Sequence, residues 1–207
     1  MDCDPLAAVF ERIVKLVRAS NDPQSCWSGI LEITGQISGA SFAGLDFPTD
    51  VASLVTQLEG VVAAEPIPSE TTFLWFGLFD LPVGNQEAEG YYVSGETGTN
   101  PGADMERTYW PESRHLKSSV LDRVKTKIVQ IRNELGLAKT ELPSEYDVLE
   151  YALMFGAAAL LTKFTIRALG IRLPVYVGFD SGDWALIANT PPDADGMRWP
   201  IMPARVV

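Results

Sequence analysis

The stretch from Tyr151 to Leu169 constrains the fold most strongly, because its residues are apolar nearly all the way round a helix. A helix without a polar face has to be buried on every side. The uncharged part of the stretch, Tyr151 to Thr162, has only twelve residues, whereas a membrane-spanning helix needs about 20. We therefore expect a central helix lying on a sheet, and no interaction with a membrane.

Two helices are predicted near the N-terminus by an aspartate placed directly before a proline, at Asp4-Pro5 and at Asp22-Pro23. An aspartate side chain caps the free amides of the first helical turn, and proline suits the first helical position. Apolar residues follow each pair at the spacing of one helical face. A shorter helix is expected from Val51 to Leu58, ending at Gly60.

Two hairpins are predicted further along the chain. The first combines Thr71–Leu81, which is aromatic and apolar on both faces, with the short β-prone segment Tyr91–Val93. Residues 94–104 are glycine-rich and are expected to form a long surface loop. The second hairpin combines Leu173–Phe179 and Trp184–Ala188 around a tight turn.

Two helices are expected between the hairpins, one from about Leu116 to Gly136 and one opening at Pro143 and Ser144. This order predicts an α+β fold: an antiparallel sheet of about four strands, formed by the two hairpins and packed with about five helices. No linker interrupts the chain, so a single domain is expected over 1–207. Its predicted parts are a helical N-terminal part over 1–60, a hairpin-helix-helix-hairpin core over 71–189, and an extended proline-rich tail over 190–207.

The charge of the chain limits the partners it can have. Sixteen basic residues against 27 acidic ones give a net charge of -11. Binding of nucleic acid or of an anionic membrane rests on clustered basic residues, so neither is expected. Residues 61–112 hold nine acids and one base, Arg107. Such a region suits docking of a basic protein partner, and it equally suits plain solubility.

Residue patterns for catalysis and for metal binding are sparse. The chain has a single histidine, His115, which excludes metal sites that need two or more histidine ligands. Residues 95–102 lack the GK[ST] ending of a phosphate loop, and the chain has no GxSxG nucleophile elbow. We therefore expect no cofactor and no metal, and a binding protein rather than an enzyme. A carboxylate-dependent hydrolase using the acidic loop with Glu112 or His115 stays open, as does a homo-oligomeric structural module.

The two cysteines, Cys3 and Cys26, are too few for a disulfide scaffold. The acidic start of the chain lacks the basic and apolar regions of a secretory signal. Both features indicate reduced cysteines in a cytoplasmic protein. A bond between Cys3 and Cys26 stays open as the alternative.

Four short motifs resemble those of small uncharacterised bacterial proteins: LWFGLFD at residues 74–80, GYYVSG at 90–95, YWPESR at 109–114 and VGFDSGD at 177–183. Some proteins of that type are encoded beside polymorphic or contact-dependent toxins and serve as their immunity proteins. The resemblance implies a cytoplasmic, acidic, single-domain inhibitor that masks the active site of a cognate toxin. It assigns no contact to an individual residue.

Candidate contact residues come from the acidic region and from the aromatic ring that follows it. Large rings in loops often mark contact surfaces, although such a ring can also anchor its loop to the core. We predict a partner-binding set of Glu87, Glu89, Glu96, Asp104, Glu106, Trp110 and Glu112.

Overall fold

The computed structural model describes residues 5–38, 45, 50–78, 91–98, 107–134, 144–179, 184–188 and 197–198. The chain divides into two compact units, and each is built from two stretches. The helical unit comprises Met1–Glu59 with Lys117–Ile171, and the sheet unit comprises Gly60–Leu116 with Arg172–Val207. Since both units take separate stretches, no single cut of the chain divides them.

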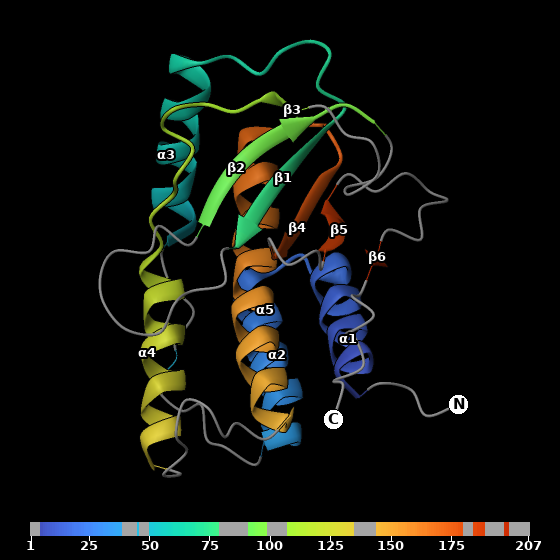
Figure 1. Ribbon diagram of the computed structural model, residues 1–207, viewed down its shortest axis with the longest axis vertical. Helices are drawn as coiled ribbons and strands as arrows, with labels where there is room; N and C mark the ends of the chain where they lie inside the picture. The colour runs from blue at the N-terminus through green and yellow to red at the C-terminus, as the bar shows by residue number, and fades with distance from the viewer. Residues whose placement is uncertain are drawn as a thin grey trace, which may run out of the picture. The chain divides into compact units, whose positions relative to one another are not determined.

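The helical unit contains α1 (Pro5–Ala19), α2 (Pro23–Ser38), α4 (Ser119–Glu134), α5 (Ser144–Leu169) and the first part of α3 (Asp50–Ala64). Helices α1, α2 and α4 all pack against α5 (Figure 1). Residues 152–162 of α5 are buried without exception, which confirms the expected buried helix.

Helix α5 has the length and composition of a membrane span over Ala152–Leu169, where mean hydropathy is 1.4 and 72% of the segment is buried. Two charged residues lie in this segment, the exposed Arg167 and the half-buried Lys163. The Lys163 Nζ donates to the carbonyls of Val17, Arg18 and Ser20 at 2.6, 2.9 and 2.6 Å. The charged Lys163 side chain thus caps the C-terminal end of α1, where the last carbonyls have no hydrogen-bond partner within the helix.

Helices α1, α2 and α5 begin at the predicted residues, whereas the end of α3 and the start of α4 differ from the prediction. Helix α2 begins at Pro23, and Asp22 Oδ2 accepts a 2.7 Å hydrogen bond from the Ser25 N–H, as a cap does. Helix α3 does not stop at Gly60 but continues to Ala64. A glycine inside a helix costs only about 1 kcal/mol, and Val61, one residue further on, is buried.

The start of α4 lies later than the sequence predicts, at Ser119. Ser118 Oγ accepts a hydrogen bond from the Leu121 N–H at 3.3 Å and so caps the helix. Residues 114–116 lie along the sheet instead: the Leu116 N–H donates to the Tyr91 carbonyl at 2.8 Å. His115 lies in this extended segment, four residues before the helix begins.

The sheet unit holds six described strands in the order β3-β2-β1-β4-β5-β6 (Figure 1). The antiparallel pairs β1–β2 and β4–β5 confirm the two hairpins, and five helices with this sheet confirm the α+β class. A tight turn makes the two strands that it joins antiparallel, but it does not set how one hairpin runs relative to the other. The two hairpins meet through β1 and β4, which run parallel, so the sheet is mixed. The strand bounds are β1 Phe73–Leu78, β2 Tyr91–Glu96, β3 Arg107–Tyr109, β4 Val175–Phe179, β5 Trp184–Ala188 and β6 Met197–Arg198.

Strand β2 extends to Glu96, so residues 94–96 form strand rather than the start of the expected loop. The glycine that suggested a loop, Gly95, is needed here for close packing. A Cβ atom at Gly95 would lie 2.7 Å from Thr71 Cγ2 and 2.9 Å from Tyr109 Cβ. The short strand β3, which was not predicted, pairs with this end of β2.

Candidate functional site

The candidate site is built on the edge loop, Trp110–Ser113, which lies between two short pairings with β2. Before the loop, β3 pairs with the end of β2. After the loop, residues 114–116 run along the start of β2, where His115 forms an isolated antiparallel bridge with Tyr92. The loop is therefore fixed to the sheet at both of its ends.

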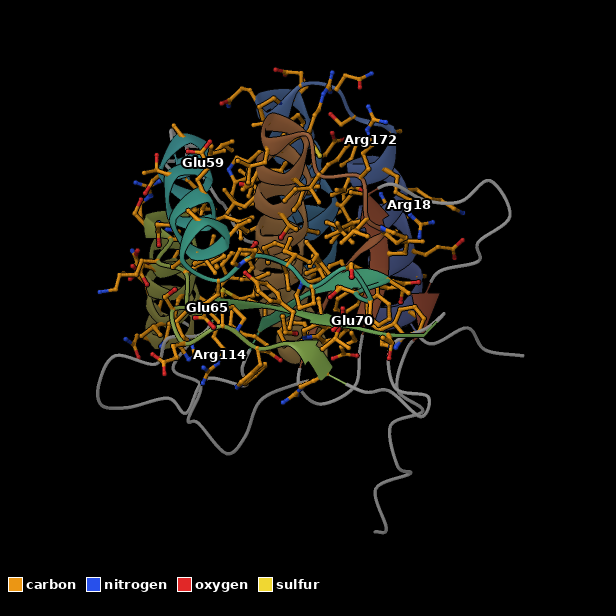
Figure 2. The ribbon with its side chains drawn as sticks, turned by 90° about the horizontal axis from the view of Figure 1, so that it is seen from above. Arg18, Glu59, Glu65, Glu70, Arg114 and Arg172 are labelled. Carbon is orange, nitrogen blue, oxygen red and sulfur yellow. The ribbon has the colours of Figure 1, made fainter. Side chains whose placement is uncertain are left out.

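Hydrogen bonds also hold the edge loop from within. The Arg114 N–H donates to the Pro111 carbonyl at 3.2 Å, as does Arg114 Nη1. The Glu112 N–H donates to Glu65 Oε1 at 2.7 Å. Glu65 and Arg114, labelled in Figure 2, both lie at this end of the sheet unit. Backbone groups at the tip of the loop thus have partners on the protein itself.

Trp110 carries two arginine side chains against its ring. The Arg107 Cζ lies 4.2 Å from the ring centroid and the Arg114 Cζ lies 4.3 Å from it. Each such cation–π contact contributes about 0.5–1 kcal/mol at an exposed site. Trp110 is 39% exposed, and it is the exposed large hydrophobic side chain in the described part of the chain. We refer to Arg107, Trp110 and Arg114 together as the Trp110 patch.

The base of the patch is the ring of Tyr92, which meets Trp110 edge to face at 5.5 Å between centroids. Tyr92 is buried, and its hydroxyl accepts a 3.1 Å hydrogen bond from Trp75 Nε1. A Cβ atom at Gly77 would overlap the Tyr92 ring, so only glycine leaves this ring its position on the sheet. The patch rests on a tightly packed support.

Glu96 lies behind Arg107 and is only 5% exposed. Its Oε1 lies 3.9 Å from Arg107 Nε. Desolvation raises the pKa of Glu96, and the nearby Arg107 opposes this by lowering it; the net direction is upward. Neither Glu96 Oε2 nor the buried Ser94 Oγ has a hydrogen-bond partner among the described residues. A carboxylate placed in this way holds Arg107 rather than facing a partner.

Arg114 has no such carboxylate. Within the described part of the chain, no acidic oxygen lies within 4.0 Å of its guanidinium, and its buried Nε has no hydrogen-bond partner there. The side chain is half-buried. The patch therefore presents a positive charge that the described structure does not neutralise, although the chain as a whole is acidic.

The structure places three of the predicted contact residues, Glu96, Trp110 and Glu112, on the same edge of the sheet. Trp110 and Glu112 are exposed, whereas Glu96 is buried. The other four, Glu87, Glu89, Asp104 and Glu106, lie outside the described residues.

Sequence reasoning did not identify Arg107 and Arg114 as parts of the site. The available signal was their spacing, three residues before and four residues after an exposed tryptophan. Arg107 is, in addition, the single base in an otherwise acidic segment.

The chemistry that this arrangement offers is recognition. An indole ring provides apolar contact, and two guanidiniums provide hydrogen-bond donors of fixed geometry. No group of three or more His, Cys, Asp or Glu side chains that could hold a metal occurs in the described part of the chain. Glu96 is the acid at this site whose pKa is raised, and the positively charged Arg107 side chain lies beside it.

A second group of titratable side chains lies in the helical unit. Burial raises the pKa of the Cys26 thiol to about 11, against smaller lowering effects from a hydrogen bond with Ser20 and from the charge of Lys163. Desolvation lowers the pKa of Lys163. Cys3 lies outside the described residues, so the expectation of two reduced cysteines stays a prediction, with a Cys3–Cys26 bond as the alternative.

Comparison with known proteins provides no relative from which a function could be transferred: no family model, curated protein or solved structure matches the chain. Function is therefore inferred from the chemistry of the Trp110 patch.

Proposed function

We propose that the chain is a binding protein, most concretely an immunity protein that neutralises a cognate bacterial toxin by direct contact through the Trp110 patch. The observation that carries the proposal is an exposed tryptophan with two arginines stacked on it. Tryptophan, tyrosine and arginine are the residue types that contribute most to binding energy at protein interfaces. The toxin as partner comes from the sequence resemblance described above.

Preorganisation of the edge loop supports the proposal. Ordering a loop on association consumes part of the binding energy. Here the loop is already paired with β2 at both ends, and Glu65 and Pro111 accept hydrogen bonds from its backbone. A partner would meet a surface that needs little rearrangement.

The total charge of -11 supports a partner that is basic overall. Opposite net charges steer two proteins together and raise the association rate, more so at low salt. The same charge argues against nucleic acid and anionic membranes as partners. A cytoplasmic location is part of the proposal and is supported by the sequence resemblance described above.

A second candidate is self-association through the same edge. Trp110 directly follows β3, and none of the described strands pairs with the outer edge of β3. Light scattering coupled to gel filtration distinguishes this candidate. A dimer that becomes a monomer in Trp110→Ala would favour it, whereas a monomer at all concentrations would exclude it.

The proposal is tested by co-expression of the chain with the product of the neighbouring gene. Protection from that product, where it is toxic, should be lost in Trp110→Ala. The affinity should fall at least about 30-fold, the size of a typical hot-spot loss. Glu70→Ala, an exposed residue of the same unit, is the matched control and should protect fully.

Two results would contradict the proposal. One is a neighbouring product that is not toxic, or whose toxicity the chain leaves unchanged. The other is full protection by a folded Trp110→Ala variant, with folding checked by circular dichroism and thermal unfolding.

A further inference from the structure

We propose that the Trp110 patch receives a carboxylate side chain of the protein partner, bound by Arg107 and Arg114 together. This rests on the proposed function, since it specifies what that partner presents at the contact. A partner that is basic overall would thus be acidic at this one point.

The geometry of the two arginines suits a carboxylate. A guanidinium stacked on an aromatic ring uses its flat face for that contact, and its N–H groups remain available around its edge. Those edges match the two oxygens of a carboxylate. Both Cζ atoms lie within 4.3 Å of one ring centroid, which keeps the two charges within about 9 Å of each other. The proposal requires both guanidiniums to turn N–H groups toward the same carboxylate within that separation.

The charge balance of the patch points the same way. Arg107 is 56% exposed, and its acidic neighbour Glu96 is buried at 3.9 Å, longer than a hydrogen bond. Arg114 has no acidic oxygen within 4.0 Å in the described part of the chain. The nearby Glu65 already accepts the Glu112 N–H. Arg114 Nη1 donates to the neutral Pro111 carbonyl, and a partner carboxylate would supply the negative charge that no described residue places beside this guanidinium.

A protein carboxylate fits this patch better than the phosphates of a nucleic acid. A polyanion approaching the patch would be repelled by the net charge of -11. A single acidic side chain on a basic protein avoids that repulsion. The exposed part of the Trp110 side chain adds an apolar contact for the surrounding surface of a protein partner.

The test uses two acetylated and amidated pentapeptides as probes, one with two glutamates among glycines and one with glutamines in their place. Binding is followed in ¹⁵N–¹H spectra through the indole signal of Trp110, assigned with Trp110→Phe, and through the arginine Nε signals. The glutamate peptide should shift these signals at millimolar concentrations, and the glutamine peptide should not. Arg107→Gln and Arg114→Gln should each weaken the effect at least fivefold. Arg172→Gln, an exposed arginine of the same unit, should not change it.

Equal shifts with both peptides, or unchanged binding in Arg114→Gln, would overturn the inference. Stronger binding of inorganic phosphate at the same signals would also overturn it, because the patch would then be a phosphate site. If Trp110→Ala abolishes protection but Arg107→Gln and Arg114→Gln still protect, the proposed function stands and the proposed carboxylate site fails. If the glutamate peptide binds but Trp110→Ala protects, the carboxylate site stands and the proposed function fails.

Discussion

The ring of Trp110 is held by aromatic and cation–π contacts with three neighbours, one of which is itself paired with a buried acid. Tyr92 meets it edge to face, Arg107 and Arg114 stack on it, and Glu96 lies behind Arg107. None of these contacts joins residues adjacent in sequence. The site is therefore sensitive to substitutions that never touch a partner.

Gly77→Ala should destabilise the protein by about 1–3 kcal/mol, the usual cost of overpacking. The added methyl group overlaps the Tyr92 ring, which must move and give up its hydrogen bond with Trp75. Gly60→Ala is the control: nothing lies within 4 Å of its new Cβ, so it should stabilise the helix by up to about 1 kcal/mol. Urea unfolding measures both changes. Equal stability of the two variants would contradict the packing at Gly77.

Glu96→Gln should increase stability at neutral pH by about 1 kcal/mol. The folded state raises the pKa of Glu96 above its ordinary value of 4.5, so it favours the protonated form. The contribution of Glu96 to stability is fully present below pH 4.5 and is lost as the pH rises through the raised pKa. The advantage of Glu96→Gln over the wild type should therefore grow from pH 4 to pH 7. A stability difference between Glu96→Gln and the wild type that does not change with pH would contradict a raised pKa of Glu96.

Cys26 should react with thiol reagents about 100-fold more slowly in the folded protein than in urea at pH 8. Burial raises its pKa to about 11, which leaves little thiolate, and its side chain is not exposed. The measurement is the absorbance released by Ellman's reagent in a Cys3→Ser background. Similar rates in the folded and unfolded states would contradict the buried position.

At the scale of elements, glycine was the least reliable guide, because one residue type answers to different physical demands. Gly60 was interpreted as a helix stop, yet it lies in open space inside α3. Gly95 was interpreted as part of a loop, yet it lies in β2 because Thr71 and Tyr109 approach closely. Only neighbours that are distant in sequence decide between these roles.

Caps were a better guide, because a cap is a local interaction. The Asp22-Pro23 pair marks the start of α2, where Asp22 accepts a hydrogen bond from the Ser25 N–H. The pairing of β2 with β3 and with residues 114–116 depends on the tertiary path of the chain. For this reason Trp110 could be predicted as a contact residue, while the two arginines around it could not.

Lys163→Met should destabilise the helical unit by about 2 kcal/mol. The change leaves three carbonyls at the end of α1 without their charged donor. Lys15→Met is the matched control, because the Lys15 side chain is 69% exposed and pairs with Glu11 on its own helix; its effect should stay below about 0.5 kcal/mol. Loss of stability of equal size in both variants would mean that the Lys163 hydrogen bonds contribute nothing.

At the scale of the whole molecule, the charge of -11 and the Trp110 patch act over different distances. Net charge governs how a partner approaches, and it is screened beyond about 8 Å at physiological salt. The patch governs what happens at contact, where Arg107 and Arg114 are locally positive. An overall acidic chain can thus combine attraction of a basic partner with recognition of one carboxylate.

Hydrogen exchange of the complex with the neighbouring gene product tests binding through the Trp110 patch most directly. Peptides covering residues 107–116 should exchange more slowly in the complex than in the free chain, with Trp110→Ala abolishing the difference. Peptides from α1 should be unaffected. Slower exchange confined to the helical unit, with residues 107–116 unchanged, would contradict the proposed contact.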